Sequence, residues 1–452
     1  MTVISTTLCY PNPAAPTQGI FVQRRLREIS KLTPLHVIAP VPWFPIVVPT
    51  RFPLGPLVRE PLVRESLLAP TPAGIPSRES LMREGIRAQG AGEAQRREGS
   101  LTQASPHMRE GIVARANPPT HYVRMPYLPG LLKRLDARHY ARALLTCIDQ
   151  LRRDKTLDRI SLIDAHFEWP DGVGAFLAAR RIGVPFVCTL RGKLVSQIAH
   201  ASKRRQLRDM LLGADALISV SKALADLANE VAGKDLKITI IPNAVDTAVF
   251  NHRPDRDALR SDLGWSPTAR HVVSVGHLQE LKGFHHLIEI WPTVRRLAGD
   301  ARLILIGGSA GEPSYERRLR TRIADLQLTN CITLTGRLPP EQVATLLNAS
   351  DLFTLASRSE GWCNALAESL ACGCPAVVTD VGGNAEVMNH WGLGRLVPHG
   401  EWATFAQRLA DALTEPWDRP KIAAFGGQRT WQQVATECVG VFSALITRPV
   451  TS

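Results

Sequence analysis

Two glutamates eight positions apart mark the segment with the most chemical potential. Glu360 stands immediately before Gly361, and Glu368 lies about two turns into a helix that we expect to begin just after this glycine. A helix start offers unpaired amides and the positive end of the helix dipole, which suit a diphosphate. Carboxylates would repel phosphate, so these two glutamates are placed to accept hydrogen bonds from hydroxyls, Glu360 from a sugar and Glu368 from a ribose. Taken alone, the segment also fits a capped surface helix with two solvated glutamates.

Two other segments carry related chemistry. Lys282 follows a short strand and the turn at Gly276-His277, and its ammonium could meet an anionic group there. The turn Val381-Gly382-Gly383 leads into another helix start and offers a second phosphate or sugar contact. Lys282 could instead simply close a surface loop.

The segment 354–388 resembles the signature of the family 4 retaining glycosyltransferases. That signature pairs two glutamates, separated by seven residues, with a following Gly-Gly-x-x-Glu, and it matches Glu360, Glu368 and 382–386. Weaker similarities extend over most of the chain outside 55–117, in the segments 19–22, 164–172, 189–192, 240–250, 275–283, 334–338 and 429–431. The resemblance implies a hexosyltransferase that retains anomeric configuration, with a nucleotide diphosphate sugar as donor and neither a metal nor a cofactor.

The resemblance also implies a set of site residues. The catalytic residues would be His166, Lys282 and Glu360, and the acceptor side would hold His166 and Arg191. In the family, the lysine at the position of Lys282 neutralises the donor diphosphate as it leaves, which is the role of a cation where no metal is used. The donor-binding residues would be Gly19, His277, Lys282, Arg337, Leu338, Glu360, Gly361, Trp362, Cys363, Asn364, Ala365 and Glu368. Two departures weaken this transfer, because His277 stands where the family usually has Arg, and Arg191 stands where it often has His. Pro242-Asn243 is expected to be a hinge or packing segment.

The elements that must position these residues alternate between strands and helices. Short apolar runs rich in β-branched residues predict strands at 3–8, 35–39, 161–165, 186–190, 216–220, 238–241, 271–275, 301–306, 331–334, 352–355 and 376–379. Helical patterns between them imply parallel, doubly wound sheets, whose ligands bind at the carboxyl ends of the strands. The predicted fold class is α/β and GT-B-like, with two facing Rossmann-like domains at 1–250 and 251–427. A last helix within 428–452 would cross back to the first domain.

One stretch interrupts this rhythm. Between 55 and 117 a short Leu-x-Arg-Glu theme recurs at irregular spacing, as in Leu57-Val58-Arg59-Glu60 and Leu81-Met82-Arg83-Glu84, with no convincing strand or long helix. The composition predicts a low-complexity insertion, mostly disordered, on a loop of the first domain. The alternative is a lid that contacts the acceptor or a membrane.

The charge balance points to an anionic partner. The 452-residue chain has a formal net charge of +13, and Lys and Arg clearly outnumber Asp and Glu between Lys133 and Arg208. This basic stretch fits an anionic lipid surface, a phosphorylated substrate or simply a solvated face. Few aromatics are interleaved with it, so we expect no nucleic-acid partner. Scattered cysteines without zinc-type spacing, and the lack of a signal-like start or a membrane-length apolar run, predict a cytoplasmic protein.

The predicted partners are therefore a nucleotide-sugar donor, a glycan or lipid-linked acceptor, and an anionic membrane surface in peripheral contact. The apolar loop Pro42-Trp43-Phe44-Pro45 favours an acceptor at the inner face of the cytoplasmic membrane, in polysaccharide or glycolipid synthesis. Two alternatives remain at this stage. One is a nucleotide-sugar epimerase of the same architecture. The other is a non-catalytic basic protein that binds lipid or nucleic acid, for which the changes at His277 and Arg191 are the best support.

Overall fold

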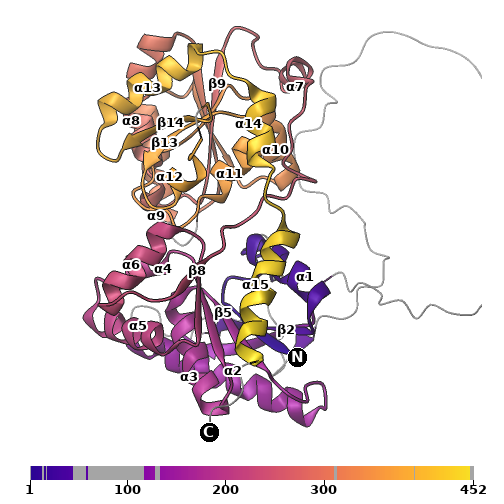
Figure 1. Cartoon of the computed structure of the whole chain (residues 1–452). Coiled ribbons are helices and arrows are strands. Elements are labelled where there is room, and N and C mark those ends of the chain that lie inside the picture. Colours follow the sequence, from indigo (N-terminus) through magenta and orange to yellow (C-terminus); the bar gives the residue numbers. More distant parts are fainter. Residues whose placement is uncertain are drawn as a thin grey trace, which may run out of the picture. The chain divides into compact units, whose positions relative to one another are not determined.

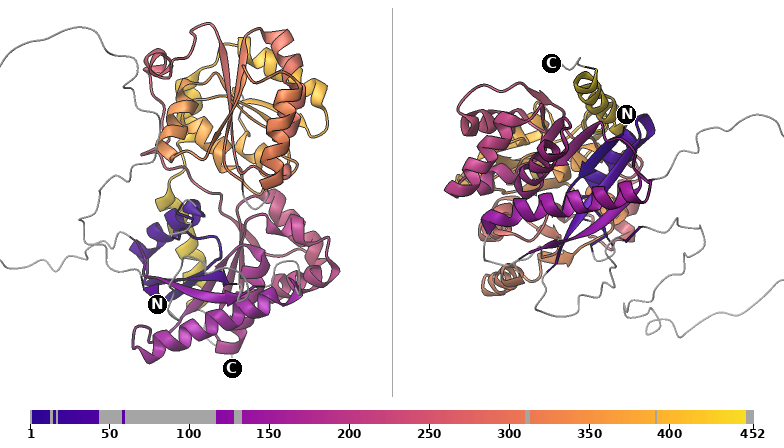
Figure 2. Two further views of the ribbon diagram at one scale, coloured as in Figure 1. Left: turned by 180° about the vertical axis from the view of Figure 1, so that it is seen from behind. Right: turned by 90° about the horizontal axis from the view of Figure 1, so that it is seen from below.

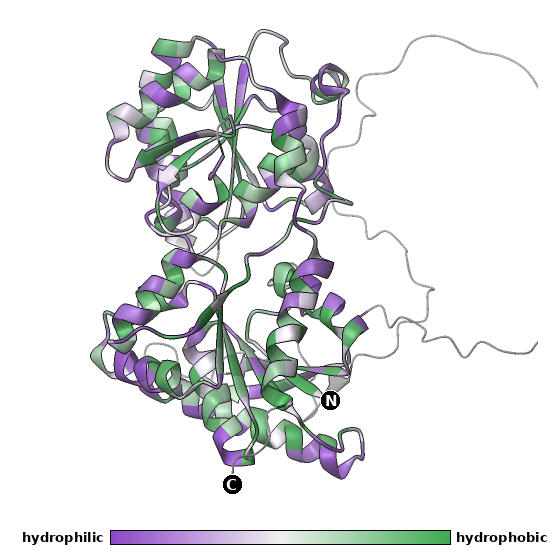
Figure 3. Cartoon of the chain, in the orientation of Figure 1, coloured by the Kyte–Doolittle hydropathy of each residue, from purple (hydrophilic) through white to green (hydrophobic). Residues whose placement is uncertain are grey.

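The computed structural model describes residues 2–12, 15–16, 18–43, 58–59, 117–127, 133–309, 313–390 and 392–447. The elements form two separate sheets with helices on both faces (Figure 1). Figure 3 shows that the strands are mostly apolar, whereas the helices alternate between apolar and polar residues. This is the pattern of two sheets that are each buried on both sides.

The first sheet has the strand order β3-β4-β2-β1-β5-β6-β7-β8. Its strands are β1 (Val3–Thr6), β2 (Leu35–Trp43), β3 (Val58–Arg59), β4 (Thr120–Pro126), β5 (Leu162–His166), β6 (Phe186–Leu190), β7 (Ala216–Ser219) and β8 (Ile238–Ile240). All neighbours pair in parallel except β3 and β4, which are antiparallel. The carboxyl ends of β1 and β5 therefore lie side by side, and this edge positions His166.

Helices from both ends of the chain cover one face of this sheet. Helix α1 (Ile20–Leu32) packs beside α15 (Trp431–Ile446), and Leu26, Val434 and Phe442 share one core with strand residues (Figures 1 and 2). The other face carries α2 (Asp136–Arg153), α3 (Val173–Ile182) and α5 (Ala201–Gly213). The remaining elements of this part are η2 (Lys133–Leu135), the π-helical turn η3 (Glu168–Gly172), α4 (Lys193–Gln197) and α6 (Lys222–Ala232).

The second sheet is parallel throughout, in the order β11-β10-β9-β12-β13-β14. Its strands are β9 (Arg270–Val275), β10 (Ala301–Ile306), β11 (Ile332–Gly336), β12 (Leu352–Leu355), β13 (Ala376–Asp380) and β14 (Gly394–Pro398). Helices α8 (Phe284–Ala298) and α13 (Trp402–Thr414) cover one face, and α10 (Pro340–Ala349), α11 (Asn364–Ala371) and α14 (Arg419–Gly426) cover the other (Figure 1). The other elements are α7 (Arg256–Asp262), η4 (Glu280–Lys282), α9 (Pro313–Asp325) and α12 (Asn384–Val387).

The predicted pair of Rossmann-like domains is confirmed, as is the packing of the last helix against the first sheet. The prediction of no strand within 55–117 is wrong at Val58–Arg59, because these residues pair with Tyr122 and His121 of β4. The rest of that stretch, except Asn117, lies outside the described residues, so its predicted disorder stays a prediction, as do the domain boundaries. Within the described ranges, no helix combines the length and apolarity needed to cross a bilayer.

Candidate functional site

An ion pair between Lys282 and Glu360 lies next to the start of α11. Glu360 is buried, with 7% of its surface exposed, and Lys282 donates from Nζ to both of its carboxylate oxygens, at 2.6 and 2.9 Å. Ser357 Oγ donates to Glu360 Oε1 at 2.7 Å. The Cys363 side chain does not cap the first turn of α11. The predicted combination of an acidic group, a lysine and a helix start is therefore brought together.

Electrostatics favour the charged form of this lysine. Burial alone would lower the pKa of the Lys282 ammonium, but the Glu360 carboxylate outweighs this effect and raises the pKa above its usual value. The lysine is consequently a permanent cation near neutral pH. Its charge is neutralised by Glu360 until another anion, such as a phosphate, competes for it.

Glu368 lies at the middle of α11, about one turn after its first residue, and is half-buried. Burial raises the pKa of this carboxyl to about 7, while Arg24 opposes the shift and Asp246 reinforces it. Arg24 itself pairs with Asp246 at 3.0 Å. Among the described residues, Glu368 has no hydrogen-bond partner for its carboxylate, so it can accept hydroxyl hydrogen bonds in its ionised form.

Gly361, before α11, and Gly383, before α12, permit a very close approach between chain segments. A Cβ placed on Gly361 would lie 2.7 Å from the Arg191 carbonyl oxygen, and one on Gly383 would lie 2.5 Å from the Gly361 carbonyl oxygen. The Gly383 amide also donates to the Glu360 carbonyl at 3.3 Å. Three loops, around 191, 361 and 383, therefore converge at the helix start, and any side chain at these glycines would push them apart.

Three cations act on His277, which replaces the arginine usual in the resembled family. Crowding by protein atoms lowers the pKa of this imidazole, and the nearby charges of Arg337, Lys282 and Lys193 lower it further. Arg337 donates from Nη2 to the Ser309 carbonyl at 3.5 Å. The charges of three cations thus reach the imidazole, and these cations can together offer the positive charge that a diphosphate requires.

His166, at the end of β5, is fully buried. Its Nε2 lies 3.2 Å from Asp164 Oδ2 and 3.0 Å from Ser5 Oγ, and Arg191 Nη2 lies 3.4 Å from its Nδ1. Burial lowers the pKa of His166 to about 4 in spite of Asp164, so the ring is neutral. Because Arg191 donates to Nδ1, the ring proton resides on Nε2. Contact with a sugar, which was predicted, requires Arg191 to leave Nδ1 and stays a prediction.

A chain of polar side chains continues from Arg191. Arg191 Nη1 donates to Asn243 Oδ1 at 3.0 Å, and Asn243 Nδ2 donates to Asn364 Oδ1 at 3.0 Å. Burial lowers the pKa of Arg191 to about 9, which leaves it protonated at neutral pH. Asn243, predicted to have only a hinge or packing role, therefore connects His166 and Arg191 to the first residue of α11.

No individual role was predicted for Glu168 and Asp171 of η3, although both lie within the segment 164–172 that resembles the family. Glu168 is fully buried and accepts backbone hydrogen bonds from Arg191, Gly192 and Lys193, at 2.9 to 3.0 Å. Asp171 accepts from the Leu8 amide at 2.6 Å, and burial raises its pKa to about 7. A signal existed, since both acids stand in an apolar segment directly after a buried strand.

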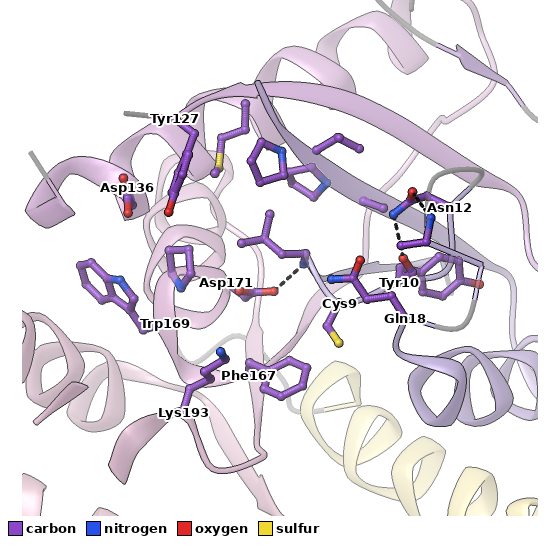
Figure 4. A pocket seen from close by; sticks show the side chains of 18 of the residues that line it. Cys9, Tyr10, Asn12, Gln18, Tyr127, Asp136, Phe167, Trp169, Asp171 and Lys193 are labelled. Carbon is purple, nitrogen blue, oxygen red and sulfur yellow. Dashed lines mark hydrogen bonds between the residues drawn. The ribbon is translucent and has the colours of Figure 1, made fainter. Parts of the chain in front are cut away.

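Asp171 belongs to a cavity of about 820 Å³ at the carboxyl ends of the strands of the first sheet (Figure 4). Its wall combines apolar and aromatic side chains with five charged ones. The aromatic members are Tyr10, Tyr122, Tyr127, Phe167 and Trp169, and the charged members are Lys133, Asp136, Asp171, Lys193 and Lys203. The size and the mixed lining suit a small sugar-like molecule.

The other predicted donor residues are mainly structural in their contacts. Gly19 caps α1 with a φ of 68°, and a Cβ there would collide with the Cys9 carbonyl. Cys363 is buried, and Leu338, Trp362 and Ala365 pack against the same core cluster. Among the residues that the structure describes, no group of three or more His, Cys, Asp or Glu side chains is arranged to hold a metal ion.

Comparison with known proteins identifies the family of this chain. The model of the glycosyl transferases group 1 matches residues 255–428, and that of glycosyltransferase family 4 matches residues 98–249. The D-inositol 3-phosphate glycosyltransferase of Pseudarthrobacter chlorophenolicus is 26% identical over 348 residues, 74% of this chain and 80% of the relative. The putative teichuronic acid biosynthesis glycosyltransferase TuaC of Bacillus subtilis is 28% identical over 291 residues, 64% and 68% of the two chains.

Solved structures share the fold. Sucrose-phosphate synthase of Thermosynechococcus elongatus superimposes with a TM-score of 0.68 at 16% identity, over 98% of both chains. Anabaena HepE, solved in complex with UDP and glucose, superimposes with a TM-score of 0.65 at 18% identity, over 98% of this chain and 100% of the other. The two family models follow each other along most of the chain, and the chain belongs to the GT-B glycosyltransferases of group 1 and family 4.

Proposed function

We propose that this glycosyltransferase transfers a sugar from a nucleotide diphosphate to an acceptor hydroxyl with retention of anomeric configuration and without a metal ion. The observation that carries the proposal is the Lys282–Glu360 pair at the uncapped start of α11. A cation, free helix amides and a sugar-directed carboxylate are what a departing diphosphate and its sugar require in the absence of a metal.

The reaction forms one bond and breaks one bond at the anomeric carbon. The acceptor oxygen bonds to this carbon on the face from which the diphosphate leaves, and the hydroxyl proton moves to the departing phosphate oxygen. Lys282, the amides after Gly361 and the turn at 382–384 hold the diphosphate, and the charges of Lys193 and Arg337 beside His277 support it. Glu360 orients the sugar hydroxyls, and Glu368 accepts from the ribose. His166 contacts the transferred sugar once Arg191 releases it.

The cavity at η3 supports an acceptor site in the first domain, because it is lined by aromatic and polar groups and contains Lys193, whose charge acts on both Asp171 and His277. A role in cell-surface polysaccharide or glycolipid synthesis draws support from the relative named for teichuronic acid biosynthesis. All eight cysteines are free thiols, which supports a cytoplasmic site of action.

A donor screen tests the proposal. The protein is incubated with UDP-, GDP-, ADP- and dTDP-sugars and a bacterial glycolipid extract, with and without EDTA, and products are identified by mass spectrometry and by proton NMR of the anomeric signal. Transfer with a retained configuration, unchanged by EDTA, is expected. Inversion, abolition by EDTA, or conversion of the donor into an epimer without any acceptor would contradict it.

A further inference from the structure

The cavity is lined by two lysines, Lys133 and Lys203, that donor chemistry does not use. We propose that Lys133 and Lys203 form a subsite for an anionic group, a phosphate or carboxylate, on the acceptor sugar. The inference rests on the proposed function in one respect, namely that the cavity receives the acceptor. It adds the chemical class of that acceptor.

Asp136 is the carboxylate that acts on both ammonium groups. Lys133 Nζ lies 3.7 Å from Asp136 Oδ2, which is an ion pair but too long for a hydrogen bond. Burial raises the pKa of Asp136. Burial lowers the pKa of Lys203, the charge of Lys133 lowers it further, and the charge of Asp136 opposes this shift. The charge of each group therefore affects the pKa of its neighbours. Two ammonium groups and one carboxylate leave an excess of one positive charge.

The hydrogen-bonding capacity of these ammonium groups is largely unused. Lys133 Nζ is buried and has no hydrogen-bond acceptor among the described residues, although an ammonium can donate three times. Lys203 Nζ donates once, to Gln197 Oε1 at 2.7 Å. Asp136 alone cannot satisfy both lysines, whereas the several oxygens of a phosphate or carboxylate can.

Both ammonium groups lie close to an aromatic ring. Lys133 Nζ lies 3.4 Å from the centroid of the Tyr127 ring, and Lys203 Nζ lies 5.7 Å from that of Trp169. These contacts hold the ammonium groups in the cavity wall beside apolar surfaces on which a sugar ring can lie. The arrangement thus offers a platform for the ring and cations for its charged substituent.

The surrounding surface has the same sign. Arg134 and Arg138 near the start of α2, and Arg204 and Arg205 on α5, are exposed, and none of them forms an ion pair within the described part of the chain. Helix α5 is held near η2 by a hydrogen bond from Gln206 Nε2 to the Arg134 carbonyl at 3.3 Å. This basic rim would attract an anionic molecule toward the lysine pair.

The test compares two double variants with equal loss of charge. K133Q/K203Q removes the lysine pair, and K234Q/K237Q removes two exposed lysines elsewhere in the same domain. Glucose 6-phosphate and glucose serve as probes, and their binding to the full-length protein is measured by calorimetry at 0.15 M salt. Nucleotide-sugar binding and thermal unfolding are measured on the same preparations.

We expect the wild type to bind glucose 6-phosphate at least roughly tenfold more tightly than glucose, which is the order of one charged hydrogen bond. K133Q/K203Q should lose this preference while its nucleotide-sugar binding stays normal, and K234Q/K237Q should keep both. Equal binding of the two probes by the wild type, binding of neither, or equal losses in both variants would overturn the subsite. The wild type could instead bind phosphatidylglycerol vesicles but not glucose 6-phosphate. This result would indicate that the lysines bind a membrane, and it would overturn the subsite as well. Absence of nucleotide-sugar binding in the wild type would instead remove the proposed function and leave the subsite result standing.

Discussion

Replacing Lys282 by methionine tests whether this lysine stabilises the leaving diphosphate or only neutralises the charge of Glu360. Lys282→Met keeps much of the apolar stem and removes the charge that lies 2.6 Å from Glu360 Oε1. If Lys282 stabilises the departing diphosphate, its loss should reduce kcat by roughly 10²–10³-fold, as for the removal of one preorganised donor to a developing anion. Coulomb's law gives a compatible scale of about 4 kcal/mol for unit charges 4 Å apart at an effective dielectric constant of 20.

The same substitution also has a structural cost. Among the described residues, Ser357 would be the one side-chain partner left to the buried Glu360. An incompletely satisfied buried carboxylate costs about 1–3 kcal/mol or more of unfolding free energy. Urea unfolding measures this cost directly. Lys282→Arg, which keeps a cation, and Lys222→Met, which removes an ion-paired lysine on the surface of α6, serve as controls.

A double-mutant cycle with Glu360→Gln gives the decisive comparison. A cation that acts on the diphosphate should lower kcat by a similar factor whether residue 360 is Glu or Gln. A lysine that only neutralises Glu360 should have no effect once that charge is gone. Turnover by K282M/E360Q equal to that of E360Q would therefore refute the role of Lys282 in leaving-group stabilisation.

Three further predictions concern the neighbouring groups. Glu368 is protonated below its pKa of about 7, so donor affinity should rise roughly five- to tenfold as the pH increases from 6 to 8. In a calorimetric titration Glu368→Gln should flatten this pH profile, and an unchanged profile would contradict the ribose contact. Asn243→Ala removes the partner of Arg191 and of Asn364 and should cost about 1–3 kcal/mol in urea unfolding while raising the KM for the donor; a variant with wild-type values would show that the chain of side chains is incidental. Glu386 accepts from the Lys222 and Ala223 amides at 2.8 and 3.0 Å, so Glu386→Ala should lower stability by about 1 kcal/mol, and a value near zero would contradict this capping role at α6.

The sequence was most informative where chemistry and local structure coincide. The spacing of Glu360 and Glu368 around Gly361 predicted a helix start between them, and α11 begins at Asn364. Strand–helix alternation predicted two parallel sheets, because strands buried on both faces are apolar throughout. Strand β4 was missed because its sequence mixes polar and apolar residues and follows the low-complexity stretch. Strand β14 was missed because Gly394 and Arg395 interrupt its apolar run.

The contacts within the site could not be predicted in the same way. The hydrogen bond between Lys282 and Glu360 joins residues 78 positions apart, and that between Asn243 and Asn364 joins residues 121 positions apart. Such pairings depend on tertiary packing, which local patterns do not encode. The burial of His166 illustrates the same limit, because the end of a strand can face either the ligand or the core. Only the structure places Arg191 and Asp164 against its ring.

Hydrogen–deuterium exchange of the backbone amides, followed by mass spectrometry, tests the central claim most directly. The protein is compared alone and saturated with the nucleotide diphosphate sugar that the donor screen selects. We expect increased protection of the peptides that cover 361–366 and 382–386, and loss of this protection in Lys282→Met at equal donor concentration. Protection that is confined to other segments, or that Lys282→Met leaves intact at both places, would show that the donor does not lie against the start of α11.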